Sequence, residues 1–149
     1  MTNETIKRMF DACYKAKRIR EMLPPLPKGV MPSFIHYLDV IKKLEATGVQ
    51  VKISDISNVM NIPRPGVTRT VKDMESKGYL KKTASPMDKR ITYITLTASG
   101  KKLSQKYDED YFTALVPYLD NIPEENIDIT VNTIEMFYEV MKNRRKDFE

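Results

Sequence analysis

The sequence has few of the residues from which metal sites, disulfides and phosphate-binding loops are built. Its 149 residues include one cysteine, Cys13, and one histidine, His36. This excludes an intrachain disulfide and argues against cysteine-rich or histidine-rich metal sites. A single cysteine also fits a reducing compartment. The five glycines form none of the spacings GxGxxG, GxxxxGK[ST] or GxSxG, so the sequence predicts neither a phosphate-cradling loop nor a nucleophile elbow.

Long apolar runs are missing as well. No run approaches about 18 apolar residues, so we expect no membrane-spanning helix. The first ten residues lack the apolar core of a secretory signal, from which we expect a cytoplasmic protein. No nucleophile–base pairing or carboxylate dyad stands out, so we expect a protein that is not an enzyme and that needs no metal or other cofactor.

The positive charge is concentrated in one segment. The chain carries 25 basic and 20 acidic residues, a net charge of +5. Between Arg64 and Arg90 there are eight basic and three acidic residues, so this segment alone accounts for the net charge. Of the remaining residues, Lys7 to Arg20 is basic and Asp108 to Glu139 is acidic. These two stretches either attract each other, within or between chains, or are solvated helix faces.

Hydrophobic periodicity predicts helices, with one pair of strands between them. We expect N-caps at Asn3, Ser54 and Thr97. Prolines make residues 24–32 a linker, residues 48–53 suggest a brief strand, and a break is expected between Pro117 and Pro123. The expected helices cover residues 3–23, 32–47, 54–61, 64–77, 97–115 and 124–145, and the expected strands cover residues 80–84 and 91–96.

This order of elements is that of a winged helix-turn-helix. Val67, Val71 and Met74 lie at i, i+4 and i+7, so they would hold the fourth helix on the core and turn its other face toward a DNA major groove. A cationic hairpin tip can enter the minor groove, where Asp88 would hold Arg90 through a local ion pair. The DNA-binding candidates are Arg64, Pro65, Thr68, Arg69, Lys72, Asp88, Lys89 and Arg90.

Two stretches make the interpretation more specific. The run Ser85-Pro86-Met87-Asp88-Lys89-Arg90 followed by Ile94-Thr95-Leu96-Thr97-Ala98-Ser99-Gly100 resembles the "D-x-R … L-T-x-x-G" wing signature of the MarR family. The stretches 53–62 and 67–80 resemble that family's helix-turn-helix, and the likeness covers essentially the whole chain. The sequence departs from the family in its proline-rich elbow at residues 24–27 and in Pro65-Gly66, which stand where hydroxyl residues are common.

The resemblance implies a mainly α fold with a small β-hairpin and flanking dimerisation helices. It implies a homodimeric, cytoplasmic regulator of transcription that binds a palindromic double-stranded DNA operator. The expected parts are a dimerisation helix and elbow (residues 1–31), a DNA-binding domain (32–97) and C-terminal dimerisation helices (98–149). The dimerisation candidates are Ile6, Phe10, Cys13, Ile127, Val131, Ile134, Phe137, Tyr138 and Met141.

Three alternatives stay open. Many proteins of the family respond to small aromatic or lipophilic effectors, and the pocket candidates here are Met9, Met22, Met31, Tyr37 and Tyr111. Cys13 is either a structural residue of the first helix or a redox-active thiol. A winged helix also serves as a protein-interaction module, in which case the basic face would bind an acidic protein partner.

Overall fold

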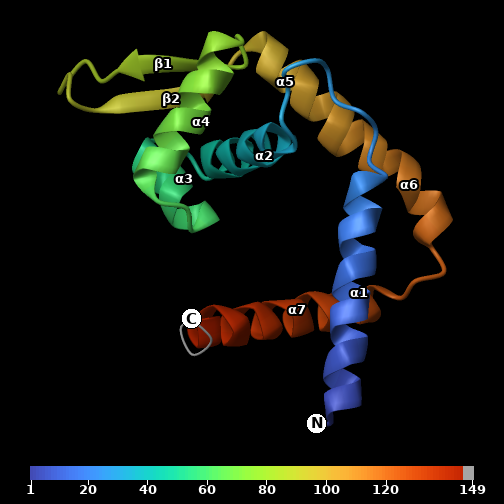
Figure 1. Cartoon of the computed structure of the whole chain (residues 1–149). Coiled ribbons are helices and arrows are strands. Elements are labelled where there is room, and N and C mark those ends of the chain that lie inside the picture. The colour runs from blue at the N-terminus through green and yellow to red at the C-terminus, as the bar shows by residue number, and fades with distance from the viewer. Residues whose placement is uncertain (146–149) are drawn as a thin grey trace. The chain divides into compact units, whose positions relative to one another are not determined.

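The winged-helix part of the chain is built around one helix, which buries one face in the core. The structure is a computed structural model that describes residues 1–145 (Figure 1). The chain separates into two compact units, Met1–Glu109 and the part that begins at Asp110. In the first unit, helix α2 (Pro32–Ala46) buries Phe34, Tyr37, Leu38, Val40 and Ile41. Pro32 begins this helix, as expected, because a proline fits the first helical turn.

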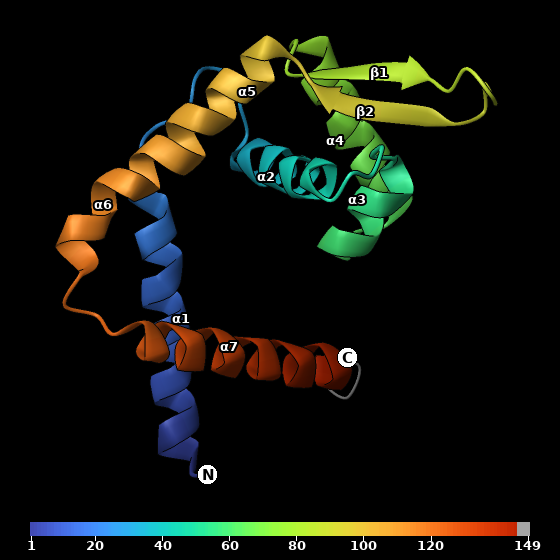
Figure 2. The same ribbon diagram turned by 180° about the vertical axis from the view of Figure 1, so that it is seen from behind.

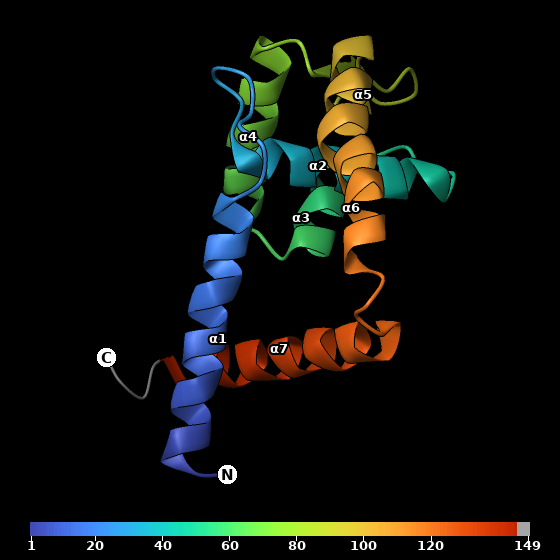
Figure 3. The same ribbon diagram turned by 90° about the vertical axis from the view of Figure 1, so that its right-hand side faces the viewer.

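The other elements of the core pack around α2. They are α3 (Ile53–Met60), α4 (Arg64–Ser76), β1 (Leu80–Ala84), β2 (Thr92–Leu96) and α5 (Ala98–Ser104). Helix α2 lies between α3 and α5 (Figures 2 and 3). The core contributed by these elements includes Ile56, Val67, Val71, Met74, Leu80, Ile94, Leu96 and Leu103. The expected winged helix-turn-helix is therefore confirmed as a fold.

Two helix starts differ from the sequence prediction. Helix α1 (Asn3–Glu21) is capped by Thr2, not Asn3, because the Thr2 hydroxyl accepts the Thr5 N–H at 3.2 Å. Helix α3 begins one residue before Ser54, with Lys52 as its N-cap. The reason is that the Asp55 carboxylate reaches back and accepts the Lys52 N–H at 2.8 Å, which fixes the first turn.

Both helices of the helix-turn-helix end in the left-handed backbone region. Asn61 terminates α3 at φ 53°, a conformation that asparagine tolerates better than most residues. Gly78 follows α4 at φ 80°, as its position in the sequence predicts, because a glycine has no Cβ to clash there.

The wing is an antiparallel hairpin. Strands β1 and β2 pair from Leu80 with Leu96 to Ala84 with Thr92, and the second strand starts one residue later than expected. The prediction of a brief strand over residues 48–53 was wrong, because this segment forms no strand. This segment instead touches β2 through one bond, in which the Ile94 N–H donates to the Val51 carbonyl at 2.8 Å. The lone bond anchors the segment without forming a ladder.

The base of the wing is closed by Thr97. Its hydroxyl donates to the Gly78 carbonyl at 2.5 Å and accepts the Gly100 N–H at 3.1 Å, and its own N–H donates to the Tyr79 carbonyl at 3.1 Å. The predicted N-cap at Thr97 is thus confirmed. Gly100 lies so close to Tyr79 that a Cβ built on it would fall 2.1 Å from the Tyr79 carbonyl oxygen.

Helix α5 passes into a π-helical turn, Gln105–Asp110, and then into α6 (Tyr111–Leu119). The break expected between Pro117 and Pro123 falls after Leu119 and before Glu124. Pro117 stands near the end of α6 and removes only the bond that its N–H would donate to the carbonyl of Thr113, so the helix continues for two residues beyond it. Helix α7 (Glu124–Arg144) follows. No helix within residues 1–145 is long and apolar enough to cross a membrane.

Candidate nucleic-acid interface

Helix α4 presents one buried and one exposed face. Val67, Val71 and Met74 are 0% exposed, as their spacing predicts. The polar candidates are exposed on the remaining surface of the same helix, and Pro65 lies in its first turn. The exposed candidates of α4 are Arg64, Pro65, Thr68, Arg69 and Lys72. The structure therefore holds this helix on the core by one stripe and leaves its cationic side chains in solvent.

The tip of the wing contains the predicted ion pair. Arg90 Nε lies 3.1 Å from Asp88 Oδ1, and a terminal guanidinium nitrogen lies 3.2 Å from Oδ2. The Arg90 N–H also donates to Asp88 Oδ1 at 3.0 Å. These bonds lower the pKa of Asp88, the side-chain bond from Arg90 contributing most. Asp88 thus orients Arg90, whose side chain is still 91% exposed.

The other basic residues of this segment divide into two groups. Lys77 pairs with Asp73 and lies over the Phe34 ring, while Lys82 pairs with Glu75 at 3.1 Å. These lysines are largely committed to the fold. In the part of the chain that the structure describes, no acidic side chain lies within 4.0 Å of the remaining five, which are Arg64, Arg69, Lys72, Lys81 and Lys89. Their charge is available to an anion.

The dimerisation candidates lie on two helices that bury little. Neither α1 nor α7 has a buried residue. On α1, Ile6 is 37% and Phe10 48% exposed, and Cys13 is half-buried. On α7 the candidates Ile127, Val131, Ile134, Tyr138 and Met141 are all 44–58% exposed, and Phe137 is half-buried. Two long helices therefore carry apolar stripes that this chain leaves largely uncovered.

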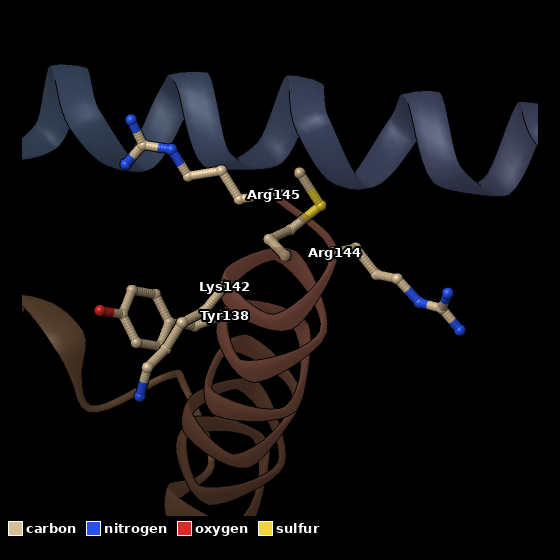
Figure 4. Close-up of a pocket in the computed structure, with 5 residues that line it drawn as sticks. Tyr138, Lys142, Arg144 and Arg145 are labelled. Atoms are coloured by element: carbon tan, nitrogen blue, oxygen red, sulfur yellow. The ribbon is translucent and has the colours of Figure 1, made fainter. Parts of the chain in front are cut away.

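The effector-pocket candidates differ in their environments. Tyr37 is 2% exposed and belongs to the core, whereas Met22 and Met31 are 70% and 56% exposed. Met9 and Tyr111 are half-buried. A separate pocket lies at the carboxyl end of α7, lined by Tyr138, Met141, Lys142, Arg144 and Arg145 (Figure 4). It contains none of the effector candidates and shares Tyr138 and Met141 with the dimerisation stripe.

A polar cluster between α2 and the helix after the wing was not predicted. Lys42 donates to the buried Ser104 hydroxyl at 3.2 Å and pairs with Glu109. Beside it, burial and the charge of Asp39 raise the pKa of Asp108. Lys42 and Ser104 are 62 residues apart, so no local pattern could reveal the contact. Residues 1–145 contain no group of three or more His, Cys, Asp or Glu residues that could hold a metal ion.

Comparisons with known proteins agree with this geometry. The model of the MarR family matches residues 35–91. A Bacillus subtilis relative, the uncharacterized HTH-type transcriptional regulator YdgJ, is 27% identical over 85 residues, which cover 57% of this chain and 52% of the relative. The match thus spans about half the length of that relative.

Solved structures show the same fold. Streptococcus pneumoniae FabT, in a complex with DNA, matches with a TM-score of 0.64 at 20% identity and 95% coverage of both chains. The adhesin competence repressor AdcR of Streptococcus pyogenes matches with a TM-score of 0.65 at 19% identity, covering 95% of this chain and 98% of that one. The predicted winged-helix fold is thus confirmed, and residues 35–91, which contain the helix-turn-helix, are similar to the MarR family, as the sequence resemblance predicts.

Proposed function

We propose that the chain acts as a homodimer that binds a palindromic double-stranded DNA operator and regulates transcription by occupying it. Each protomer would place α4 in the major groove and the tip of the wing in the adjacent minor groove. A small aromatic or lipophilic effector would change the spacing of the two α4 helices. Such a regulator works where the DNA is, which we take to be the cytoplasm.

The observation that carries this proposal is the cationic surface of α4 and the wing. Arg64, Arg69 and Lys72 are exposed and have no acidic side chain within 4.0 Å among residues 1–145, and Lys89 and Arg90 extend from the wing. Lysine and arginine bind phosphates, and arginine also makes bidentate contacts to a guanine edge. The segment that contains them accounts for the whole net charge of the chain.

Homodimerisation is supported by α1 and α7. Helices of 19 and 21 residues with no buried residue gain little from packing in the single chain. Their exposed apolar stripes are of the kind that marks interaction surfaces. A second copy of the chain would cover them, and a two-fold dimer would present two α4 helices to half-sites about one helical turn apart.

The fold comparison supports DNA as the ligand. The FabT structure, which shares this fold, was solved with DNA. The alternative of an acidic protein partner uses the same exposed cations, so the distinguishing property is preference for a DNA sequence.

Selection of binding sequences from a random pool of about 30-bp duplexes tests the proposal. We expect a palindrome to be enriched and to bind at least 1,000-fold more tightly than mixed-sequence duplex. Equal affinity for both DNAs, as measured by fluorescence anisotropy, would contradict the proposal and favour the protein-interaction module.

Arg69→Ala sharpens the same test. We expect about a tenfold loss of affinity for the selected duplex and a relaxed base preference at one position in each half-site, because a bidentate base contact would be lost. Lys101→Ala, which removes an exposed charge from α5, is the matched control and should leave the affinity unchanged. A loss that is equal for all sequences would make Arg69 a phosphate contact instead.

The proposed binding of a small-molecule effector can be tested separately. Thermal-shift screening with phenolic ligands should reveal a stabilising compound, and Tyr111→Ala should reduce its effect. Stabilisation that is unchanged in this variant would remove Tyr111 from the proposed pocket.

A further inference from the structure

The tip of the wing carries an apolar side chain among charged ones. Met87 is 94% exposed, more than any other large apolar residue of the described chain except Met1. Its neighbour Pro86 is also exposed. The hairpin loop that contains them extends away from the helices of the domain (Figure 1). Solvation favours charged residues at such a position, so solubility does not explain a methionine there.

The loop that holds Met87 is closed on itself. The Ser85 N–H donates to the Ile91 carbonyl at 2.8 Å, and the Ile91 N–H donates to the Asp88 carbonyl at 2.9 Å. The Met87 N–H donates to the hydroxyl of Ser85, a residue that is only 4% exposed, at 3.3 Å. Because these bonds already fix the turn, little loop entropy remains to be lost when the tip binds.

The charges around Met87 favour its approach to a polyanion. Asp88 is the acidic residue of the tip, and Arg90 occupies both of its carboxylate oxygens. Lys89 is exposed, and the Arg90 side chain is 91% exposed despite this pair. The DNA phosphates would therefore attract the positively charged tip toward the minor groove, and Met87 would enter the groove together with Lys89 and Arg90.

We propose, on the basis of the proposed function, that Met87 is an apolar wedge that contacts base edges and sugars in the minor groove and partly opens one base step. Proteins that insert apolar side chains there unstack the step and bend the duplex. Pyrimidine–purine steps open most readily, so the wedge would give a preference at a position that no hydrogen bond reads. Met87 is thus a specificity-determining residue, distinct in its chemistry from Arg90.

The test compares four full-length proteins on the selected duplex: wild type, Met87→Gln, Met87→Leu and Val49→Gln. Glutamine keeps the length of methionine but is polar, and leucine remains apolar. Val49, 42% exposed outside the wing, is the matched control. Affinity is measured by anisotropy at five salt concentrations, and bending by energy transfer between dyes at the duplex ends.

For Met87→Gln we expect affinity to fall about tenfold, with an unchanged slope of log K against log salt and a smaller bend. Met87→Leu should keep at least a third of the wild-type affinity, and Val49→Gln should match the wild type. The selected sites should have a pyrimidine–purine step where the wing lies.

Several results would overturn the wedge. These are unchanged affinity or bend in Met87→Gln, a changed salt slope, an equal loss in Met87→Leu, or a wild-type complex with straight DNA. If the wild type shows no sequence preference at all, the proposed function itself fails, so the two failures are distinguishable.

Discussion

Helices α2 and α7 have similar amphipathic patterns and opposite environments. The 15-residue α2 buries five side chains inside its own domain. The 21-residue α7 buries none, although apolar residues recur along it. The difference shows that the winged-helix part of the chain covers its apolar surface by itself, whereas α1 and α7 leave theirs largely exposed in the single chain. Stability of the core and assembly of the protein should therefore respond to different substitutions.

The largest expected effect is on the core, through Gly100→Ala. The added Cβ would lie 2.1 Å from the Tyr79 carbonyl oxygen, so the backbone of α5 or of the wing must shift. We expect the free energy of unfolding to fall by about 3 kcal/mol. Chemical denaturation followed by circular dichroism measures it. Ser99→Ala, at the neighbouring exposed position, is the control, and an equal effect of both substitutions would contradict the close approach.

A smaller effect, on assembly, is expected from Ile134→Glu in α7. Ile134 is 44% exposed in the single chain, so a charge there costs the monomer little. In the proposed dimer the charge would be buried, and we expect the dissociation constant of the dimer to rise about 100-fold, or about 2.7 kcal/mol. Analytical ultracentrifugation measures this.

The control for assembly is Asn132→Glu, which adds the same charge to an exposed position of α7. It should leave the dimer intact, and neither variant should change the unfolding of the domain around α2. A monomeric wild type, or equal weakening by both variants, would break the comparison between a self-sufficient core and partner-dependent helices.

The smallest effect is local to the wing. Hydrogen bonds from Arg90 favour the charged form of Asp88 and lower its pKa, so the pair is intact above the ordinary aspartate pKa and is lost as pH falls through the lowered value. Titration of the Asp88 carboxyl by NMR should show this low pKa, and Arg90→Ala should raise it. Ile134→Glu should leave it unchanged, because the wing does not depend on assembly.

Periodic and local features were predictable from the sequence. Val67, Val71 and Met74 follow the helical repeat, and all three are buried. Asp88 and Arg90 are two residues apart, so the tight turn of the hairpin loop is enough to bring them into an ion pair. The winged helix-turn-helix followed from the order of such features.

Features that depend on backbone approach or on distant residues were not predictable. The Lys42–Ser104 contact joins residues 62 apart, and the Gly100–Tyr79 approach exists only once the hairpin has closed. The cap of α3 was misplaced because Asp55 bonds backwards to Lys52, which makes the more conventional Ser54 unnecessary. The DNA, dimer and effector residues stay predictions, since they concern partners rather than the chain.

The closure of the wing at Thr97 has a consequence for how such a protein changes over generations. Thr97 joins the residues after α4 to the first turn of α5, so the hairpin leaves and re-enters the domain at one fixed place. Substitutions or small insertions between Ser85 and Ile91 alter the tip without moving α4 or α5. The tip of the wing can therefore change while the scaffold is preserved, and residues at its base should be far less tolerant of mutation than those at its tip.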